Sequence, residues 1–274
     1  MLVNENALKK VFGPIIDAIP GGRKIFHRLR HGPKPPAAFQ GWGMTTNRVP
    51  PWENETALSR DFLKVNEELE KAVRERRFHM TQYADFEDKQ AILKDLLWRH
   101  YTVFWSARFA GEARAGVLVE CGVSDGLTAY FASKAFNNAK KIYLYDAWDK
   151  MQLDELLESE TIHSDYAYLT LERTQKNLEA LNAEYIKGYI PDVFTSHTTP
   201  KDIVWLHIDL NASKPTLDSL EEMYKNVSSG GIILFDDYAG RAFGDTRHVV
   251  DTFFADKAGL LLPLPTGQAM FFKR

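Results

Sequence analysis

From Ala115 onward, the sequence alternates between short apolar runs and stretches of helical periodicity. The apolar runs predict strands and read "GVLVECG", "KIYLYD", "AEYIKG", "DIVWLHID" and "GGIILFDD", while "LLLPLP" and "QAMFFKR" predict a closing hairpin. Helices are predicted at 127–137, 165–182, 214–226 and 245–257. Strands that are apolar throughout need cover on both faces, and the helices between them supply it. We therefore expect an α/β, Rossmann-like domain over 111–274, built on a mostly parallel seven-stranded sheet.

A helical segment at 59–110 precedes this domain. Phe62, Val65 and Leu69 fall on one helical face, and the run from 86 to 109 carries more large apolar side chains than a solvent-facing helix needs. Such a helix packs on the sheet or on another subunit. We expect this segment to form a lid and part of the interface of a homo-oligomer.

Residues 1–58 are predicted to be a basic leader followed by a Pro-rich linker, "HGPKPPAAF". The first 34 residues hold seven Lys or Arg and two acids, a local excess of 7 minus 2, or +5. Interleaved apolar residues suit peripheral contact with an anionic membrane surface or an acidic partner. An oligomer arm or a leader with ordinary solvated charges explains the same pattern.

Composition narrows the class of protein. The net charge of −3 gives no field that would attract nucleic acid, and the six tryptophans form no stacking stripe. The single cysteine, Cys121, fits a reducing compartment and is predicted to be buried and inert. Because no apolar stretch reaches the length of a bilayer span, we expect a cytoplasmic protein, with membrane-peripheral contact through the leader as the alternative.

Carboxylates end most of the predicted parallel strands. They are Glu120, Asp146, Asp209, Asp236 and Asp237. In an open parallel sheet the ligand binds outside the carboxyl ends of the strands, so these five acids are predicted to share one rim.

The turn after the first strand, "ECGVSDG", is predicted to bind a cofactor. Gly122 and Gly126 let the backbone approach a ligand closely, but the spacing differs from the dinucleotide fingerprint, and Glu120 would repel a pyrophosphate. A ligand with a positive centre, such as S-adenosylmethionine, suits the turn better. Asp146 ends the second strand, where it is placed to accept hydrogen bonds from both ribose hydroxyls.

The acids of the fourth and fifth strands suggest a cation. Asp236 and Asp237 are adjacent and would repel each other unless a cation compensates. With Asp209 they offer three carboxylates, an oxygen site of the type that suits Mg²⁺. The plainer interpretation is that one of the pair caps the next helix and the other is solvated.

Five motifs in order resemble the macrocin O-methyltransferase family of class I S-adenosylmethionine-dependent methyltransferases: "RFHMTQY", "LVECGVSDG", "IYLYDAWD", "LHIDLNASKPT" and "GGIILFDDYAG". The resemblance spans roughly 78–274. It implies Mg²⁺ on Asp209, Asp236 and Asp237. It also implies cofactor contacts from Met80, Thr81, Glu120, Gly122, Asp125 and Asp146, with Gly188 and Tyr189 lining the cofactor cleft.

The sequence departs from the family at Asn211. Sugar-modifying members of the family continue the fourth-strand motif as Asp-Gly-Asp, and the second acid is a candidate base; here an amide stands there, which cannot take a proton at neutral pH. His248 and His207 are candidate substitutes, with Tyr238 a third. The alternatives are that His248 is an exposed helix residue, His207 a hydrogen-bonded core residue and Tyr238 a packing residue.

The function expected from the sequence is an S-adenosylmethionine-dependent, Mg²⁺-assisted O-methyltransferase. By resemblance, its acceptor would be a hydroxyl of a sugar or glycan-type small molecule. Asn211 keeps a second interpretation open, a methyltransferase-like module that binds cofactor without catalysis. A nicotinamide-dependent oxidoreductase is a third, disfavoured by the missing phosphate fingerprint.

Overall fold

The structure is a computed structural model, and it describes residues 50–274 except 84–87, 113, 153–155, 158–165 and 240–242. The described part is one compact unit, Pro50–Arg274. Of the predicted basic leader and Pro-rich linker at 1–58, residues 1–49 lie outside the described residues.

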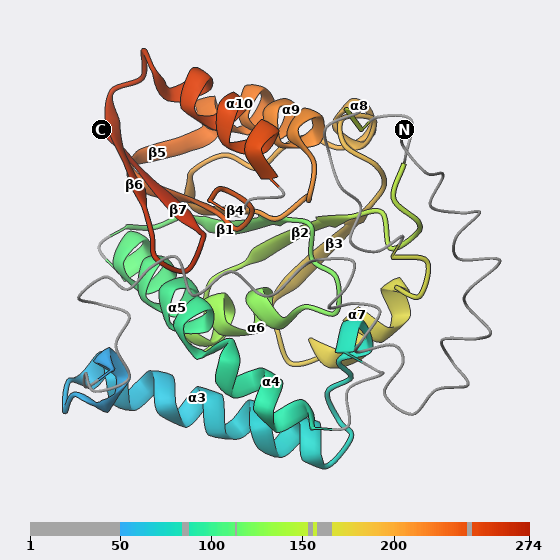
Figure 1. Cartoon of the computed structure of the whole chain (residues 1–274), viewed down its shortest axis with the longest axis vertical. Helices are drawn as coiled ribbons and strands as arrows, with labels where there is room; N and C mark the ends of the chain where they lie inside the picture. The colour runs from blue at the N-terminus through green and yellow to red at the C-terminus, as the bar shows by residue number, and fades with distance from the viewer. Residues whose placement is uncertain (1–49, 84–87, 113, 153–155, 158–165, 240–242) are drawn as a thin grey trace, which may run out of the picture. The chain divides into compact units, whose positions relative to one another are not determined.

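The core of this unit is a seven-stranded sheet with the order β3-β2-β1-β4-β5-β7-β6 (Figure 1). The strands are β1 Val117–Cys121, β2 Ile142–Asp146, β3 Ala183–Lys187, β4 Ile203–Ile208, β5 Val227–Phe235, β6 Gly259–Pro263 and β7 Ala269–Lys273. The first five pair in parallel, and β7 runs antiparallel to both β5 and β6. The predicted α/β fold, with its mostly parallel sheet and closing hairpin, is therefore confirmed.

Helices cover both faces of the sheet. On one face lie α8 Val193–Ser196, α9 Ser213–Met223, which continues into η5 Tyr224–Asn226, and α10 Gly244–Phe254. On the other lie α5 Leu97–Glu112, α6 Leu127–Lys134 and α7 Leu171–Asn177 (Figure 1). The helix predicted at 165–182 is shorter than expected, because Thr170 caps it by accepting a hydrogen bond from the Arg173 amide.

The N-terminal helices belong to the same core as the sheet. They are η2 Pro51–Glu53, α3 Ala57–Arg74, η3 Thr81–Tyr83 and α4 Lys89–Asp95. The helical run predicted at 86–109 is divided at Leu96 into α4 and α5. Phe62 of α3 and Phe104 of α5 are fully buried in one cluster with Trp205 of β4, whose indole N–H donates to Ser106 Oγ at 2.9 Å.

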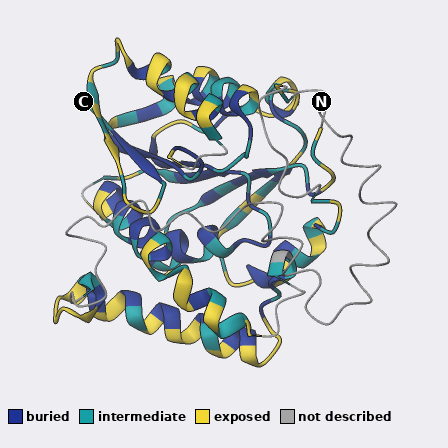
Figure 2. Ribbon diagram, in the orientation of Figure 1, coloured by how far each residue is buried: buried dark blue, intermediate teal, exposed yellow. Residues whose placement is uncertain are grey.

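Side-chain alternation along β1 and β4 decides which residues face these helices. These two central strands are almost wholly buried (Figure 2). Leu118 and Trp205 pack toward α5, whereas Val119, Cys121 and Leu206 belong to the opposite cluster. Glu120 and His207 are paired in register and share the α5 side, so two polar side chains lie beneath the end of the sheet. None of the described helices is both long and apolar enough to cross a membrane.

Candidate active site

A cleft of about 490 Å³ opens at the carboxyl ends of β1, β2, β4 and β5. This is the edge where open parallel sheets bind ligands. Eight of the residues singled out from the sequence line it: Gly122, Asp146, Gly188, Tyr189, Asp209, Asn211, Asp236 and Asp237. The predicted convergence on one rim therefore holds for four of the five strand-end acids, and Glu120 is the one that lies beneath the cleft.

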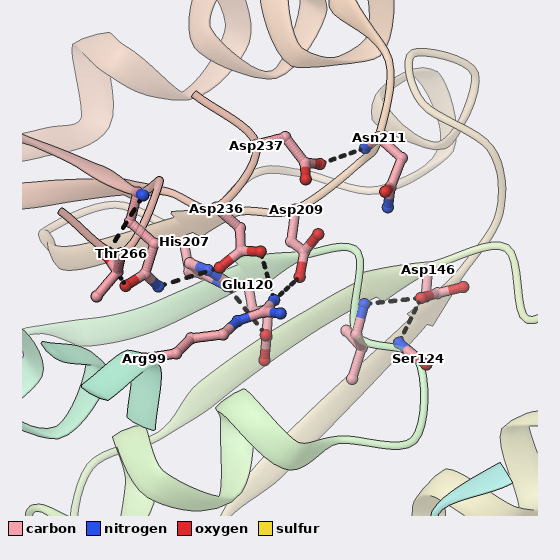
Figure 3. A network of polar contacts seen from close by, with 12 residues as sticks. Arg99, Glu120, Ser124, Asp146, His207, Asp209, Asn211, Asp236, Asp237 and Thr266 are labelled. Carbon is pink, nitrogen blue, oxygen red and sulfur yellow. Dashed lines mark hydrogen bonds and ion pairs between the residues drawn. The ribbon is translucent and has the colours of Figure 1, made fainter. Parts of the chain in front are cut away.

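Asp146 fixes the Gly-rich turn at the cofactor side of the cleft. Its Oδ2 accepts from the backbone amides of Val123 at 2.7 Å and Ser124 at 2.9 Å (Figure 3). Its Oδ1 accepts from the backbone amide of Trp148 at 2.7 Å. Burial raises the pKa of Asp146, and these three amides oppose the rise. Oδ2 accepts from two amides, whereas Oδ1 accepts from one and keeps a lone-pair site free, so the carboxylate can still accept from a ligand hydroxyl.

Gly122 brings the turn against the acid-bearing strand. Its φ is +84°, and a Cβ built on it would lie 1.8 Å from the Asp209 carbonyl oxygen. The Asp209 amide also donates to the Cys121 carbonyl at 2.8 Å. A side chain at residue 122 would therefore separate the two strand ends that form the cleft.

We expect Gly122→Ala to lower the free energy of unfolding by more than about 2 kcal/mol, from left-handed strain and the backbone clash together. Gly267→Ala is the matched control, because Gly267 has a φ of +89° but no atom within 4 Å of its built Cβ. That control should cost only about 1 kcal/mol of strain. Urea unfolding of both variants measures the difference, and equal losses would contradict the predicted contact.

Met80, Thr81 and Asp125 do not line the cleft. Asp125 accepts from the Thr81 amide at 2.5 Å and from the Thr81 hydroxyl, and Met80 is buried in the core. Asn177 donates to the carbonyls of both Asp125 and His79. In this structure, these contacts tie the turn to the N-terminal segment. Gly126 caps α6 with a φ of +90° and packs on Leu178, also outside the cleft lining.

Arg99 of α5 reaches the acid side of the cleft. One guanidinium nitrogen, Nη2, lies 2.7 Å from Asp209 Oδ2 and 2.5 Å from Asp236 Oδ2 (Figure 3). Burial alone would lower the pKa of Arg99, but Asp236 and Asp209 outweigh it and the pKa is raised. The side chain is therefore a permanent cation between the two carboxylates.

The acids in this cluster repel one another. Burial raises the pKa of Asp209 well above its usual range, and Asp236 adds to the rise. Burial and then Asp236 also raise the pKa of Asp237 to about 7. Burial and mutual repulsion thus disfavour the fully ionised form of the three carboxylates. Added positive charge would stabilise that form.

Neighbouring groups orient two of these acids. Asp237 Oδ2 accepts from the Asn211 amide at 2.8 Å, and Asn211 has a φ of +56°. Asp236 Oδ1 accepts from the Gln268 side-chain amide at 3.0 Å, and Gln268 is buried in the closing hairpin. The Asn211 backbone thus orients the Asp237 carboxylate, and the Gln268 side chain orients the Asp236 carboxylate.

Glu120 and His207 form a buried pair beneath the acid cluster. Glu120 Oε1 lies 3.0 Å from His207 Nδ1, and both side chains are at most 1% exposed. Burial raises the pKa of Glu120 and lowers that of His207, so both shifts favour the neutral forms. Glu120 Oε2 and His207 Nε2 have no hydrogen-bond partner among the described residues.

The remaining candidates for a base lie away from the cleft lining. His248 is exposed on α10. Tyr238 is buried, and its hydroxyl donates to Asp251 Oδ1 at 2.6 Å. Cys121 is buried against Met223, and burial raises its pKa.

The donor set fits a divalent cation in part. Among the described residues, His207, Asp209 and Asp236 can each offer one ligand atom, and these atoms lie within 4.8 Å of one another. Asp237 is outside that group, although it lies next to Asp209 closely enough to influence its charge. A histidine with one nitrogen held by a carboxylate is a common metal ligand. The expected three-aspartate set therefore remains a prediction.

Sequence reasoning missed Arg99, Gln268 as a support for Asp236, and Tyr166, which lines the cleft. The only signal for Arg99 was its charge near the start of a helix that carries many large apolar residues, and Arg108 on the same helix shares that signal.

Comparisons with known proteins agree with this geometry. Residues 119–238 match the protein family described as "Methyltransferase domain". No curated protein matches the sequence. The solved structures that share the fold include the O-methyltransferase NovP, which is 18% identical over 65% of this chain and 80% of its own, with a TM-score of 0.54. They also include CalS11, the calicheamicin methyltransferase, which is 14% identical over 80% of this chain and 94% of its own, with a TM-score of 0.52. The central segment of the chain is therefore similar to a methyltransferase domain, and the chain has the fold of class I S-adenosylmethionine-dependent methyltransferases.

Proposed function

We propose that the protein transfers a methyl group from S-adenosylmethionine to a hydroxyl of a sugar or glycan-type small molecule, with help from Mg²⁺. The observation that carries this proposal is a single cleft with two distinct halves. One half has Asp146 and the Gly-rich turn, and the other has Asp209 and Asp236. NovP, which shares this fold, is an O-methyltransferase, in keeping with an oxygen acceptor.

The cofactor half is suited to an adenosyl group. Asp146 Oδ1 would accept a hydrogen bond from a ribose hydroxyl while the backbone contacts of the carboxylate keep the turn in place. Gly188 and Tyr189 line the same side and would border the cofactor. Displacement at the sulfonium methyl requires the acceptor oxygen in line with it, so the chief task of these residues is alignment.

The acid half would receive the acceptor. A divalent cation held by Asp209 and Asp236, with Asp237 or His207, would lower the pKa of a bound hydroxyl. Positive charge beside the acceptor oxygen also stabilises the developing alkoxide. Asn211 lines this half but offers no base, so loss of the hydroxyl proton would rely on the acid cluster or solvent.

Mass spectrometry with S-adenosylmethionine and a panel of nucleotide-linked, lipid-linked and free sugars tests the proposal. We expect a gain of one methyl group on at least one sugar, and loss of the product when EDTA removes divalent cations. Calorimetry should show binding of S-adenosylhomocysteine and no binding of NAD. Binding of S-adenosylhomocysteine without transfer to any acceptor would favour the non-catalytic module instead.

A further inference from the structure

Arg99 contacts the same atoms that a divalent cation would use. Its Nη2 approaches Asp209 Oδ2 and Asp236 Oδ2 at 2.7 and 2.5 Å, so one nitrogen bridges both carboxylates. These two residues are also members of the group whose donor atoms lie close enough to hold a metal. The acid cluster therefore already contains a cation supplied by the chain itself.

The buried partner of the cluster points to a cation site rather than a simple ion pair. His207 is fully buried, and its Nε2 has no hydrogen-bond partner among the residues that the structure describes. Its other nitrogen is held by Glu120 at 3.0 Å. Arg99 makes no hydrogen bond to this nitrogen in the structure, whereas a divalent metal would use its lone pair.

The two cations exclude each other on distance and charge. Metal ions bind carboxylate oxygens at about 2.2 Å or less, so an ion on the same two oxygens would lie within about 5 Å of Nη2. At that separation, in a partly buried site, like charges repel strongly. The metal and the guanidinium would also compete for the same lone pairs.

Arg99 is able to leave. Its side chain is 29% exposed, and it is a long, unbranched chain on a helix that is anchored by other residues such as Phe104 and Trp105. Figure 3 shows the guanidinium lying between the two aspartates and Glu120, whose Oε2 is unpartnered in the described structure. Glu120 Oε2 would therefore be available as an acceptor for the displaced guanidinium.

We propose that Arg99 is the resident cation of the acid cluster and competes with the divalent metal for Asp209 and Asp236. Without metal, Arg99 holds the two carboxylates together and relieves their repulsion. Metal binding displaces it. The inference rests on the proposed function, because it concerns the metal named there.

The competition is tested by titrating the full chain with Mn²⁺ in the presence of S-adenosylhomocysteine. Electron paramagnetic resonance measures how much Mn²⁺ is bound. Arg99→Met removes the charge and keeps apolar bulk, and we expect it to bind Mn²⁺ at least 10-fold more tightly than the unaltered protein. Arg99→Lys keeps the charge but loses the planar fork, so its affinity should fall between the two. Arg108→Met is the matched control, because Arg108 lies on the same helix and pairs with Asp61 instead.

A second measurement covers the case in which Arg99→Met folds poorly. Thermal unfolding of the Arg99 variants should show a larger rise in Tm on addition of Mn²⁺ than the unaltered protein shows. A crystal of the unaltered protein grown with Mn²⁺ should show the ion on Asp209 and Asp236 with the guanidinium moved away. Mn²⁺ and Arg99 bound together on both carboxylates would overturn the inference.

The outcomes separate this inference from the proposed function. Equal Mn²⁺ affinity in the unaltered protein and Arg99→Met overturns the competition but leaves metal assistance intact. Binding in Arg99→Met alone supports the competition and removes the metal from the proposed function. If neither protein binds Mn²⁺, both statements fail, while methyl transfer itself can still be measured in the presence of EDTA.

Discussion

Asp146→Asn is expected to weaken binding of S-adenosylhomocysteine by about 10- to 100-fold, since a charge-assisted hydrogen bond to a ribose hydroxyl is worth about 1.5–3 kcal/mol. The backbone adds to the effect. Both carboxylate oxygens accept from amides, so an Asn side chain must turn its NH₂ toward an N–H donor. The Gly-rich turn would then lose the support that holds it against β2.

Isothermal titration calorimetry measures this loss directly and needs no knowledge of the acceptor. Glu184→Gln is a suitable control, because Glu184 is an exposed acid on the neighbouring strand β3 that pairs with Lys141. The control should bind S-adenosylhomocysteine as the unaltered protein does. An Asp146→Asn protein that remains folded and binds within twofold of normal would show that the cofactor lies elsewhere.

Asp209→Asn is expected to lower the rate of methyl transfer by about 1000-fold, the range seen when groups that stabilise developing charge are removed. Asp209 is the central acid of the cluster, because it contacts Arg99 and lies beside both Asp236 and Asp237. The amide is neutral and would weaken any cation site there. Binding of S-adenosylhomocysteine should change by less than about threefold, since Asp146 is untouched.

Single-turnover assays on the sugar identified by mass spectrometry measure this effect, and Mn²⁺ binding is the second readout. Glu221→Gln on the exposed side of α9 provides the control for loss of one negative charge. The prediction fails if Asp209→Asn retains more than a tenth of the normal transfer rate. Loss of cofactor binding as well would indicate a disturbed backbone instead of a lost carboxylate.

The fold was predictable because each strand from β1 to β5 is a continuous apolar run between polar turns. The shared rim followed from parallel strand direction alone. Glu120 was harder to place, since it is the penultimate residue of β1, and alternation turns it under the sheet end beside His207.

Arg99 could not be placed from the sequence, because it comes from α5 and meets Asp209 across 110 residues of chain. Helical periodicity predicts which face of a helix is buried, but it does not predict that one side chain extends past the end of the sheet. Likewise, Gln268 approaches Asp236 only because β7 pairs antiparallel with β5. Both contacts depend on tertiary packing.

The close approach of Gly122 to the Asp209 carbonyl also bears on how such an enzyme could change its acceptor. The Gly-rich turn and the acid cluster are in direct main-chain contact. In the proposed function, the backbone would therefore fix the distance between the methyl group and the acceptor oxygen. Adaptation to a larger or smaller acceptor would then fall to the outer walls of the cleft, where Met151, Tyr166 and Phe243 stand on connecting segments. Those three positions are where libraries aimed at new acceptors should begin.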